Sequence, residues 1–209
     1  MVSGVICFGD SILAGTGALS RENGCVKRLK KSLKIPVSIK GVNRHTSQDG
    51  LLRLTQDVIE QKHLSHVVIL FGNNDCRLTE SGQSVISSDR FLANLEEMAN
   101  RIKQNKQTPL FCNLQPIDAR KLFKFAPEFE KHGVDPESLQ KKYSVLVEEF
   151  AKRSGYVMID IRTLLENRKA EVVAEDGLHP NDFGHELIAR KILQSLQTLD
   201  PSLETIEAV

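Results

Sequence analysis

The chain has no tryptophan, and aromatic residues make up only 5% of its 209 residues. The chain therefore has few of the aromatic side chains on which sugars stack, which argues weakly against a carbohydrate-binding site. No apolar run approaches the ~18 residues that span a bilayer, so we expect no integral membrane segment. The formal net charge is only +1, which gives no global field to attract nucleic acid or an anionic membrane. The basic stretch at residues 27–34 is expected to be the solvated face of an amphipathic helix.

Close cysteine pairs and the spacing of metal ligands are also missing. The cysteines are Cys7, Cys25, Cys76 and Cys112. Reduced thiols are the expected state, and Cys76, which follows a polar motif, is the candidate for partial exposure near a site. No secretory signal is visible, because the apolar run at residues 5–8 is too short. We therefore expect a cytoplasmic protein, with a trimmed secreted form carrying an added Met1 as the alternative.

What the chain does contain is a regular alternation of short apolar runs with segments of helical period. The expected strands are residues 5–8, 36–40, 66–71, 110–114 and 156–161. Helical faces are expected at residues 51–58, 92–102 and 139–150, and a last helix from about residue 181 to 196. This alternation implies an α/β fold in which helices cover both faces of a parallel sheet. Because the motifs described next span most of the chain, we expect one domain over residues 1–209.

Three short motifs contain the parts of a serine hydrolase. They are GDS at residues 9–11, GNND at residues 72–75 and DGLH at residues 176–179. Ser11 supplies a hydroxyl, which needs a base because a free serine is a poor nucleophile at neutral pH. His179 can accept its proton, and Asp176 can bind the other ring nitrogen and fix the tautomer. Asn74 and the backbone N–H of Ser11 can donate to an oxyanion.

The first two motifs directly follow expected strands, at the edge where open parallel sheets bind ligands. Their chain order differs from the chymotrypsin, subtilisin and α/β-hydrolase orders. In order and in motifs the chain resembles the SGNH hydrolases, also called the GDSL esterase/lipase family, from residue 5 to about residue 196. The resemblance implies a flavodoxin-like three-layer α/β/α sandwich with a five-stranded parallel sheet. It also implies that Ser11 is the nucleophile, that Asp176 and His179 are the acid and base, and that Ser11 and Asn74 donate to the oxyanion.

The second sequence block of the family is altered here. Residues 46–51 resemble the segment that follows this block in bacterial acyl thioesterases and esterases of the family. Counting back from Thr46 puts Arg44 where the family has an oxyanion-hole glycine. A backbone N–H survives that change, but a left-handed conformation becomes costly without glycine. Either the loop has a different conformation from the family's, or Gly41 supplies the oxyanion-hole N–H in a shifted alignment. The Arg44 side chain either lends charge to an anionic substrate or the oxyanion, or points to solvent. His45 is a rival base without an acid at useful spacing.

The expected function is hydrolysis of a small-molecule acyl ester or thioester through an acyl-Ser11 intermediate, with no cofactor and no metal. Short-chain esters, acyl thioesters and lysophospholipids stay open as substrates, and so does the oligomeric state. The rival functions are a non-hydrolytic binding or regulatory domain on the same fold and an acyltransferase. Residues 115–136, the longest irregular segment, are expected to be a lid or wall of the substrate pocket or else a packed surface excursion.

Overall fold

The computed structural model describes residues 1–206 and contains a five-stranded sheet whose strands are all parallel. The strand order, β2-β1-β3-β4-β5, is that of flavodoxin-like sheets. The strands are β1 (Val5–Gly9), β2 (Val37–Gly41), β3 (His66–Leu70), β4 (Thr108–Cys112) and β5 (Val157–Ile159). The predicted fold class and the five predicted strands are confirmed.

β3 ends one residue earlier than the apolar pattern predicts, and β4 and β5 each end two residues earlier. β4 ends at Cys112 because the next side chain, Asn113, accepts the backbone N–H of Ile161 at 2.8 Å. β5 ends at Ile159 because Asp160 caps the helix that follows. In both places a polar side chain competes with the ladder for backbone hydrogen bonds, which an apolar run does not reveal.

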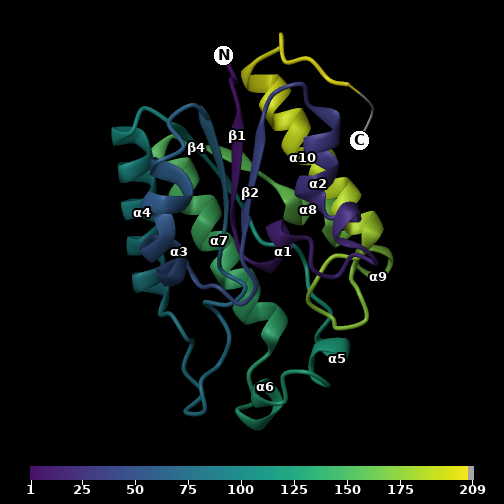
Figure 1. The fold of residues 1–209 in the computed structure, drawn as a ribbon. Helices are drawn as coiled ribbons and strands as arrows, with labels where there is room; N and C mark the ends of the chain where they lie inside the picture. Colours follow the sequence, from purple (N-terminus) through teal and green to yellow (C-terminus); the bar gives the residue numbers. More distant parts are fainter. Residues whose placement is uncertain (207–209) are drawn as a thin grey trace.

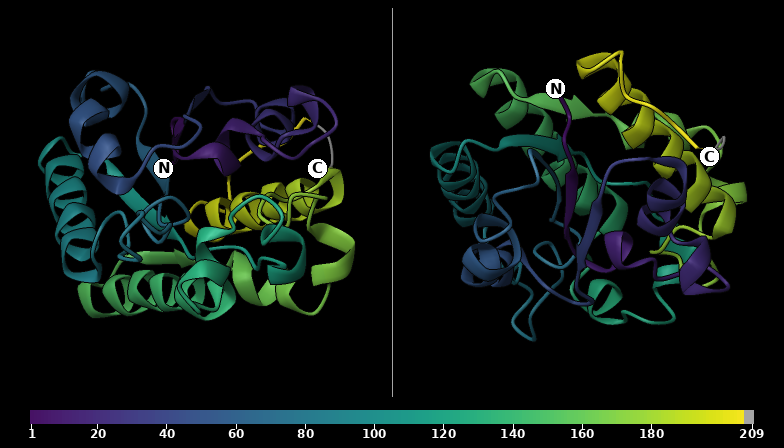
Figure 2. Two further views of the ribbon diagram at one scale, coloured as in Figure 1. Left: turned by 90° about the horizontal axis from the view of Figure 1, so that it is seen from below. Right: turned by 45° about the horizontal axis from the view of Figure 1, so that its top comes forward.

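Helices cover both faces of this sheet. The long ones are α2 (Cys25–Ser32), α3 (Ser47–Leu54), α4 (Ser88–Gln104), α7 (Pro136–Ser154), α8 (Ile161–Glu166) and α10 (Asp182–Leu199). The short ones are α1 (Ser11–Ala14), α5 (Ala119–Leu122), α6 (Glu128–Lys131) and α9 (Lys169–Val172), with single turns at Arg21–Asn23 and Thr55–Ile59. α3, α4 and α7 lie on one face, and α2, α8 and α10 on the other (Figures 1 and 2). No helix within residues 1–206 is long and apolar enough to cross a bilayer.

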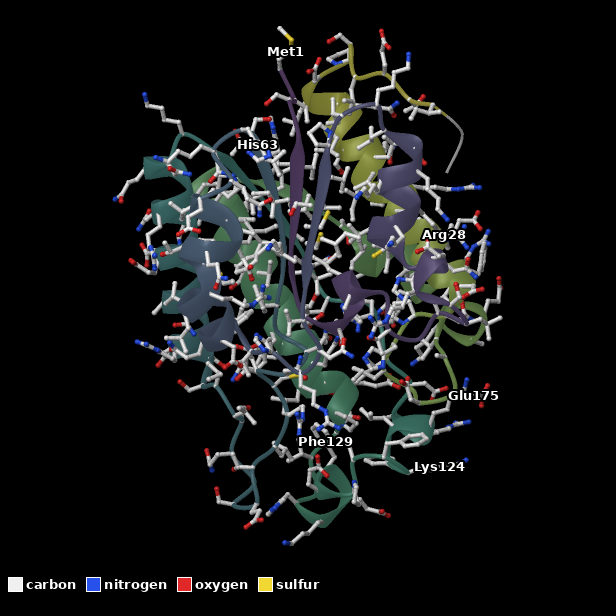
Figure 3. The ribbon with its side chains drawn as sticks, viewed as in Figure 1. Met1, Arg28, His63, Lys124, Phe129 and Glu175 are labelled. Atoms are coloured by element: carbon white, nitrogen blue, oxygen red, sulfur yellow. The ribbon has the colours of Figure 1, made fainter. Side chains whose placement is uncertain are left out.

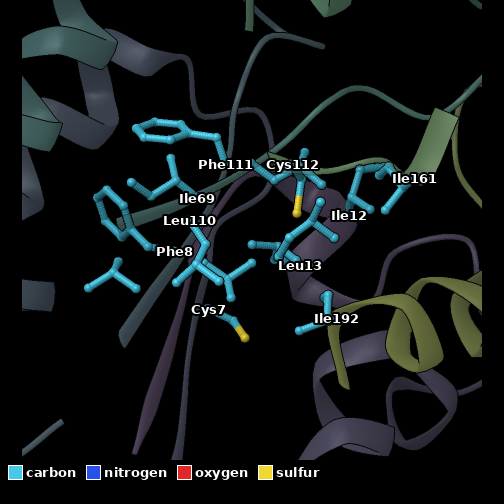
Figure 4. Packing of buried hydrophobic residues seen from close by; sticks show 14 of the residues in the cluster. Cys7, Phe8, Ile12, Leu13, Ile69, Leu110, Phe111, Cys112, Ile161 and Ile192 are labelled. Atoms are coloured by element: carbon cyan, nitrogen blue, oxygen red, sulfur yellow. The ribbon is translucent and has the colours of Figure 1, made fainter. Parts of the chain in front are cut away.

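The sheet is apolar on both sides because helices bury both sides. All residues of β1 and β3 are buried. Cys7 and Cys112 lie within this packing, as do Ile12 and Leu13 of α1 (Figure 4), and the four cysteines are buried free thiols. The main buried cluster draws on residues from Val2 to Leu203, and the single domain over residues 1–209 stays a prediction.

The carboxyl ends of the central strands lie side by side. Gly9 of β1 pairs with Gly41 of β2 and with Leu70 of β3, so the loops that follow begin at one edge. α1 packs closely over the end of β2, where a Cβ on Gly41 would lie 2.2 Å from the backbone nitrogen of Ala14. Gly41 is therefore required by the close approach of α1.

Arg53 of α3 holds this edge from one face of the sheet. Its guanidinium donates to the carbonyl oxygens of Gly9 at 2.7 Å and Lys40 at 2.9 Å, and pairs with Asp57 at 2.6 Å. It also lies 4.4 Å from the ring centroid of Phe8. These contacts offset the free-energy cost of removing the Arg53 guanidinium from water, since this side chain is only 13% exposed.

A buried carboxyl group fixes the start of α3 against the loop after β3. Thr46 caps α3 in a capping box with Asp49. The carboxyl group of Asp75 accepts the N–H of Ser47, 3.0 Å from each oxygen, and also the Ser47 hydroxyl. Asn94 of α4 donates to the same hydroxyl at 2.8 Å. Burial raises the pKa of Asp75 to about 7, although the hydrogen bonds from Ser47 oppose the shift.

Residues 115–136, with α5 and α6, lie beyond the carboxyl edge of the sheet, at the opposite end of the molecule from the N-terminus (Figures 1 and 3). A second small apolar cluster holds the segment in place. Its buried members are Leu78, Ile117, Leu122 and Phe129. The segment therefore has a core of its own.

We expect Gly41→Ala to lower the free energy of unfolding by more than ~2 kcal/mol, because the added methyl group overlaps the backbone of α1. Gly155→Ala is the matched control. Gly155 has φ 70°, and a Cβ there meets nothing within 4 Å, so only the left-handed conformation costs about 1 kcal/mol. Urea denaturation measures both, and equal losses would contradict the close approach.

We expect the titration of Asp75 to lower the stability of the protein as the pH rises from about 4 to about 7. Asp75 titrates at about 7 in the fold against an ordinary value of 3.8, so across this window the native state binds more protons than the unfolded state. Asp75→Asn should reduce the loss by an amount on the order of 2 kcal/mol. The control is Asp135→Asn, whose exposed carboxylate has a pKa lowered by the Ser138 hydroxyl. Urea midpoints across this window measure the effect, and an unchanged slope in Asp75→Asn would contradict it.

Candidate active site

Ser11 is the first residue of α1, immediately beyond the carboxyl end of β1. Asp10 caps the short helix by accepting the N–H of Ile12 at 2.9 Å. Gly15 ends it in the left-handed conformation, at φ 86°. The chain on both sides of Ser11 is thus fixed by local hydrogen bonds, and Ser11 itself is 6% exposed.

Ser11, His179 and Asp176 are hydrogen-bonded in series. Nε2 of His179 lies 2.9 Å from Oγ of Ser11, and Nδ1 lies 2.5 Å from Oδ2 of Asp176. When the Nδ1–H is donated to the carboxylate, Nε2 is left as an acceptor facing the serine hydroxyl. The fold therefore brings together, at hydrogen-bond distance, the three residues that the sequence motifs singled out.

The loop that carries Asp176 and His179 is shaped by its own hydrogen bonds. The second oxygen of Asp176 accepts the N–H of Leu178 at 2.9 Å and that of His179 at 3.0 Å. Gly177 allows this tight turn, at φ 76°. Burial opposes the ionisation of Asp176, but the His179 ring and these N–H groups outweigh it and lower the pKa to about 2. Asp176 is therefore a carboxylate at neutral pH.

Two other histidines lie close to this edge. Both ring nitrogens of His185 are hydrogen-bonded to backbone groups, at 3.2 and 2.9 Å, and burial lowers its pKa to about 4. His45 contributes its carbonyl oxygen, which accepts from Asn74. Within residues 1–206, His179 is the histidine that is hydrogen-bonded to Ser11.

Asn74 lies after β3 and lines the same cavity as Ser11. Its Nδ2 donates to the carbonyl oxygen of His45 at 3.0 Å, which fixes the orientation of the amide. The second N–H of that amide stays available to a ligand. Among the described residues, no acceptor is bonded to the backbone N–H of Ser11 or of Arg44. Three potential donors thus lie around the cavity.

Arg44 has a left-handed backbone conformation, which favours glycine. It lies in a turn closed by the bond from His45 N to Val42 O at 3.3 Å, and its φ is 66°. Arg44 is exposed and lines the cavity beside Ser11. Gly41 instead belongs to β2, where α1 packs against it. The geometry therefore places Arg44, and not Gly41, at the edge of the site.

The cavity at Ser11 has a volume of about 500 Å³ and an uneven lining. The polar lining residues include Thr16, Asn43, Arg44, Asn74 and Arg77. The 115–136 segment contributes a mostly apolar part of the lining, with Ile117, Leu122, Phe125, Ala126 and Phe129 beside one acid, Glu128. The segment thus forms a wall of the pocket, which decides between the two expectations for it. A cavity of this size suits a small-molecule ligand.

Cys76 also lines the cavity but is only 4% exposed, so the expectation of partial exposure is wrong. Burial raises the pKa of its thiol well above the ordinary range. In the part of the chain that the structure describes, no group of three or more His, Cys, Asp or Glu side chains is arranged to hold a metal ion.

The sequence analysis assigned no role to three residues behind the site, Asn73, Gln115 and Gln140, of which Asn73 and Gln140 also line the cavity. Asn73 and Gln115 follow β3 and β4, so their places after strands are the one available signal. The hydrogen bond between their side chains joins positions 42 residues apart, so no local sequence pattern predicts it.

The chain is similar to known proteins and solved structures over most of its length. A lipase/acylhydrolase structure from Enterococcus faecalis is 27% identical, with a TM-score of 0.77 over 98% of this chain and 99% of that one. A catalytic mutant of Axe2, an acetylxylan esterase from Geobacillus stearothermophilus, is 19% identical, with a TM-score of 0.72 over 93% and 94% of the two chains. The lipoprotein YqeF of Bacillus subtilis is 24% identical over 75% of this chain and 69% of its own length.

The similarity extends to a whole family. Residues 7–187 match the GDSL-like Lipase/Acylhydrolase family, a span that includes all three motifs. The sheet order, the serine after the first strand and the aspartate and histidine before the last helix agree with that match. The chain belongs to the GDSL-like lipase/acylhydrolase family of carboxylic ester hydrolases.

Proposed function

We propose that this protein is a serine esterase that hydrolyses carboxylic esters with an apolar acyl group through an acyl-Ser11 intermediate. The observation that carries the proposal is the hydrogen-bonded series from Ser11 through His179 to Asp176, inside a cavity with one apolar wall. A nucleophile, its base and the group that orients the base are thus at bonding distance before any substrate binds.

In the proposed reaction, Oγ of Ser11 attacks the ester carbonyl carbon while Nε2 of His179 takes its proton. The tetrahedral intermediate then collapses, and His179 returns the proton to the departing alcohol. Water, activated by the same nitrogen, releases the acid and regenerates Ser11. Asp176 stays ionised throughout, since its pKa is about 2, and stabilises the imidazolium that forms.

The oxyanion would bind three donors: the backbone N–H groups of Ser11 and Arg44 and the side-chain amide of Asn74. Preorganised donors of this kind often supply the largest share of catalysis. The φ of 66° at Arg44 supports the role of its backbone N–H as an oxyanion donor. Arginine adopts here the left-handed backbone conformation that otherwise favours glycine. This argues against a binding domain whose oxyanion hole has been lost.

The mostly apolar lining contributed by the 115–136 segment supports an apolar acyl group there, and the polar lining residues support a polar alcohol portion. An acyl thioester would form the same acyl-enzyme, and an acyltransferase would differ only in the acceptor that replaces water. No feature of the cavity favours either over hydrolysis of oxygen esters. A cytoplasmic location also stays a prediction.

We expect Ser11→Ala to lower kcat for p-nitrophenyl butyrate by about 10⁴-fold or more, because it removes the nucleophile. Asn74→Ala should lower kcat by about 10²- to 10³-fold through loss of one oxyanion donor. Unchanged melting temperatures would show that both variants fold. Steady-state assays at one pH measure kcat for the wild type and both variants. Full activity in Ser11→Ala would refute a reaction through an acyl-Ser11 intermediate.

We expect Phe125→Ala to change acyl-chain preference. Phe125 lines the cavity yet is 65% exposed, so its truncation removes a substrate contact with little effect on folding. The kcat/KM for p-nitrophenyl octanoate should fall about 10-fold and that for the acetate less than about twofold. Phe125→Leu, which stays apolar, is the control and should keep most of the octanoate activity. Equal losses on both esters would contradict an acyl-binding role for this wall.

A further inference from the structure

Four polar side chains are buried together behind the candidate active site. They are Asp10, Asn73, Gln115 and Gln140, and the most exposed of them, Asn73, is 3% exposed. Buried amides are costly unless their donors and acceptors are satisfied. Here the amides bond to one another, to Asp10, to backbone groups and to Arg162, so the cluster has a single well-defined arrangement.

Asn73 and Gln115 form a reciprocal amide pair at the centre of this cluster. Nδ2 of Asn73 donates to Oε1 of Gln115 at 3.3 Å, and Nε2 of Gln115 donates to Oδ1 of Asn73 at 3.1 Å. Nδ2 of Asn73 also donates to Oδ2 of Asp10 at 3.1 Å. Nε2 of Gln115 also donates to the carbonyl oxygen of Leu178 at 3.1 Å.

Helix α7 supports the pair from behind. Nε2 of Gln140 donates to Oδ1 of Asn73 at 3.0 Å and to the backbone oxygen of Gln115 at 2.7 Å. Oε1 of Gln140 in turn accepts from the guanidinium of Arg162. The cluster is thus anchored to the helices as well as to the loops.

Every loop residue held by the pair is the chain neighbour of a candidate active-site residue. Asp10 precedes Ser11, and Leu178 precedes His179. Asn73 itself precedes Asn74. One buried amide pair therefore bonds to the three separate segments that carry the nucleophile, the base and the oxyanion donor.

We propose that Gln115 is a positioning residue, which sets the relative positions of Ser11, His179 and Asn74 through its bonds to Asn73 and to the Leu178 carbonyl. The inference rests on the proposed esterase function. An apolar side chain at position 115 leaves the Leu178 carbonyl without this donor and breaks both bonds to Asn73. The base can then move relative to the nucleophile, and displacements on the order of 1 Å cost up to about 10²-fold in rate.

The chain offers a matched control at the other end of the same strand. Gln107 directly precedes β4, whereas Gln115 lies three residues after it. Gln107 is 4% exposed, and its Nε2 lies 2.9 to 3.4 Å from three backbone carbonyl oxygens, those of Val58, Gln61 and Leu64. Both glutamines are buried and bonded to carbonyl groups, but only Gln115 is near the site.

The test compares Gln115→Met with Gln107→Met, using p-nitrophenyl butyrate and thermal unfolding. Both variants should melt at a lower temperature than wild type. Gln115→Met should lower kcat by about 10- to 100-fold with KM changed less than about threefold, and Gln107→Met should change kcat by less than about twofold. If Gln115→Met does not fold, Gln115→Glu keeps the side-chain shape and loses, when ionised, the donors to Asn73 and Leu178.

A second readout separates this inference from the proposed function. The rate at which a fluorophosphonate probe labels Ser11 reports the Ser11–His179 geometry without any ester substrate, and it should fall in parallel with kcat in Gln115→Met. Equal kcat and labelling rates in the two methionine variants would overturn the positioning role while leaving the esterase intact. No labelling of the wild type, together with no ester turnover, would instead refute the esterase function.

Discussion

The candidate site depends on strands that all run in one direction. Because β1, β3 and β4 are parallel neighbours, the loops that follow them begin at a common edge, and residues 10–11, 73–74 and 115 meet there. The loop before α10 brings Asp176 and His179 to the same edge, where Gln115 bonds to it. No single loop contains the site, so its geometry is determined by how these segments are held against each other.

Polar groups that are buried at this edge hold the segments together, and some of them reduce stability. Arg53 donates to the carbonyl oxygens of Gly9, the last residue of β1, and of Lys40 in β2, and Asp75 accepts from the start of α3. Burial raises the pKa of Asp75 to about 7 and that of Asp10 to about 6, which means that the fold opposes the ionisation of both. Asp176, by contrast, has its charge stabilised by three hydrogen bonds. The edge thus combines one stabilised carboxylate with two carboxyl groups that resist ionisation.

Much of this arrangement could be predicted from the sequence, because it follows from local patterns. Apolar runs indicated the strands, and three short motifs indicated Ser11, Asn74, Asp176 and His179, which the fold brings to one cavity. The missing glycine at position 44 was visible too, but the sequence could not say whether arginine would adopt φ 66° there. That outcome depends on the neighbouring loop, which is a tertiary effect.

The rest could not be predicted, because it depends on pairs of residues far apart in the chain. The Asn73–Gln115 amide pair spans 42 positions, and the apolar wall of residues 115–136 acquires its role only when it folds over Ser11. Strand ends were missed for a related reason, since Asn113 and Asp160 divert backbone hydrogen bonds that an apolar count assigns to the ladder. The burial of Cys76 could not be predicted, because the exposure of a residue after a strand depends on which distant segments pack over its loop.

In the proposed mechanism, Ser11 carries the acyl group between the two halves of the reaction. Acid quenching during turnover of p-nitrophenyl octanoate, followed by mass spectrometry of the digested protein, tests it most directly. We predict a mass increase of one octanoyl group on the peptide that contains Ser11, and none on any other peptide. Turnover without acylation of that peptide, or acylation at another residue, would contradict the account.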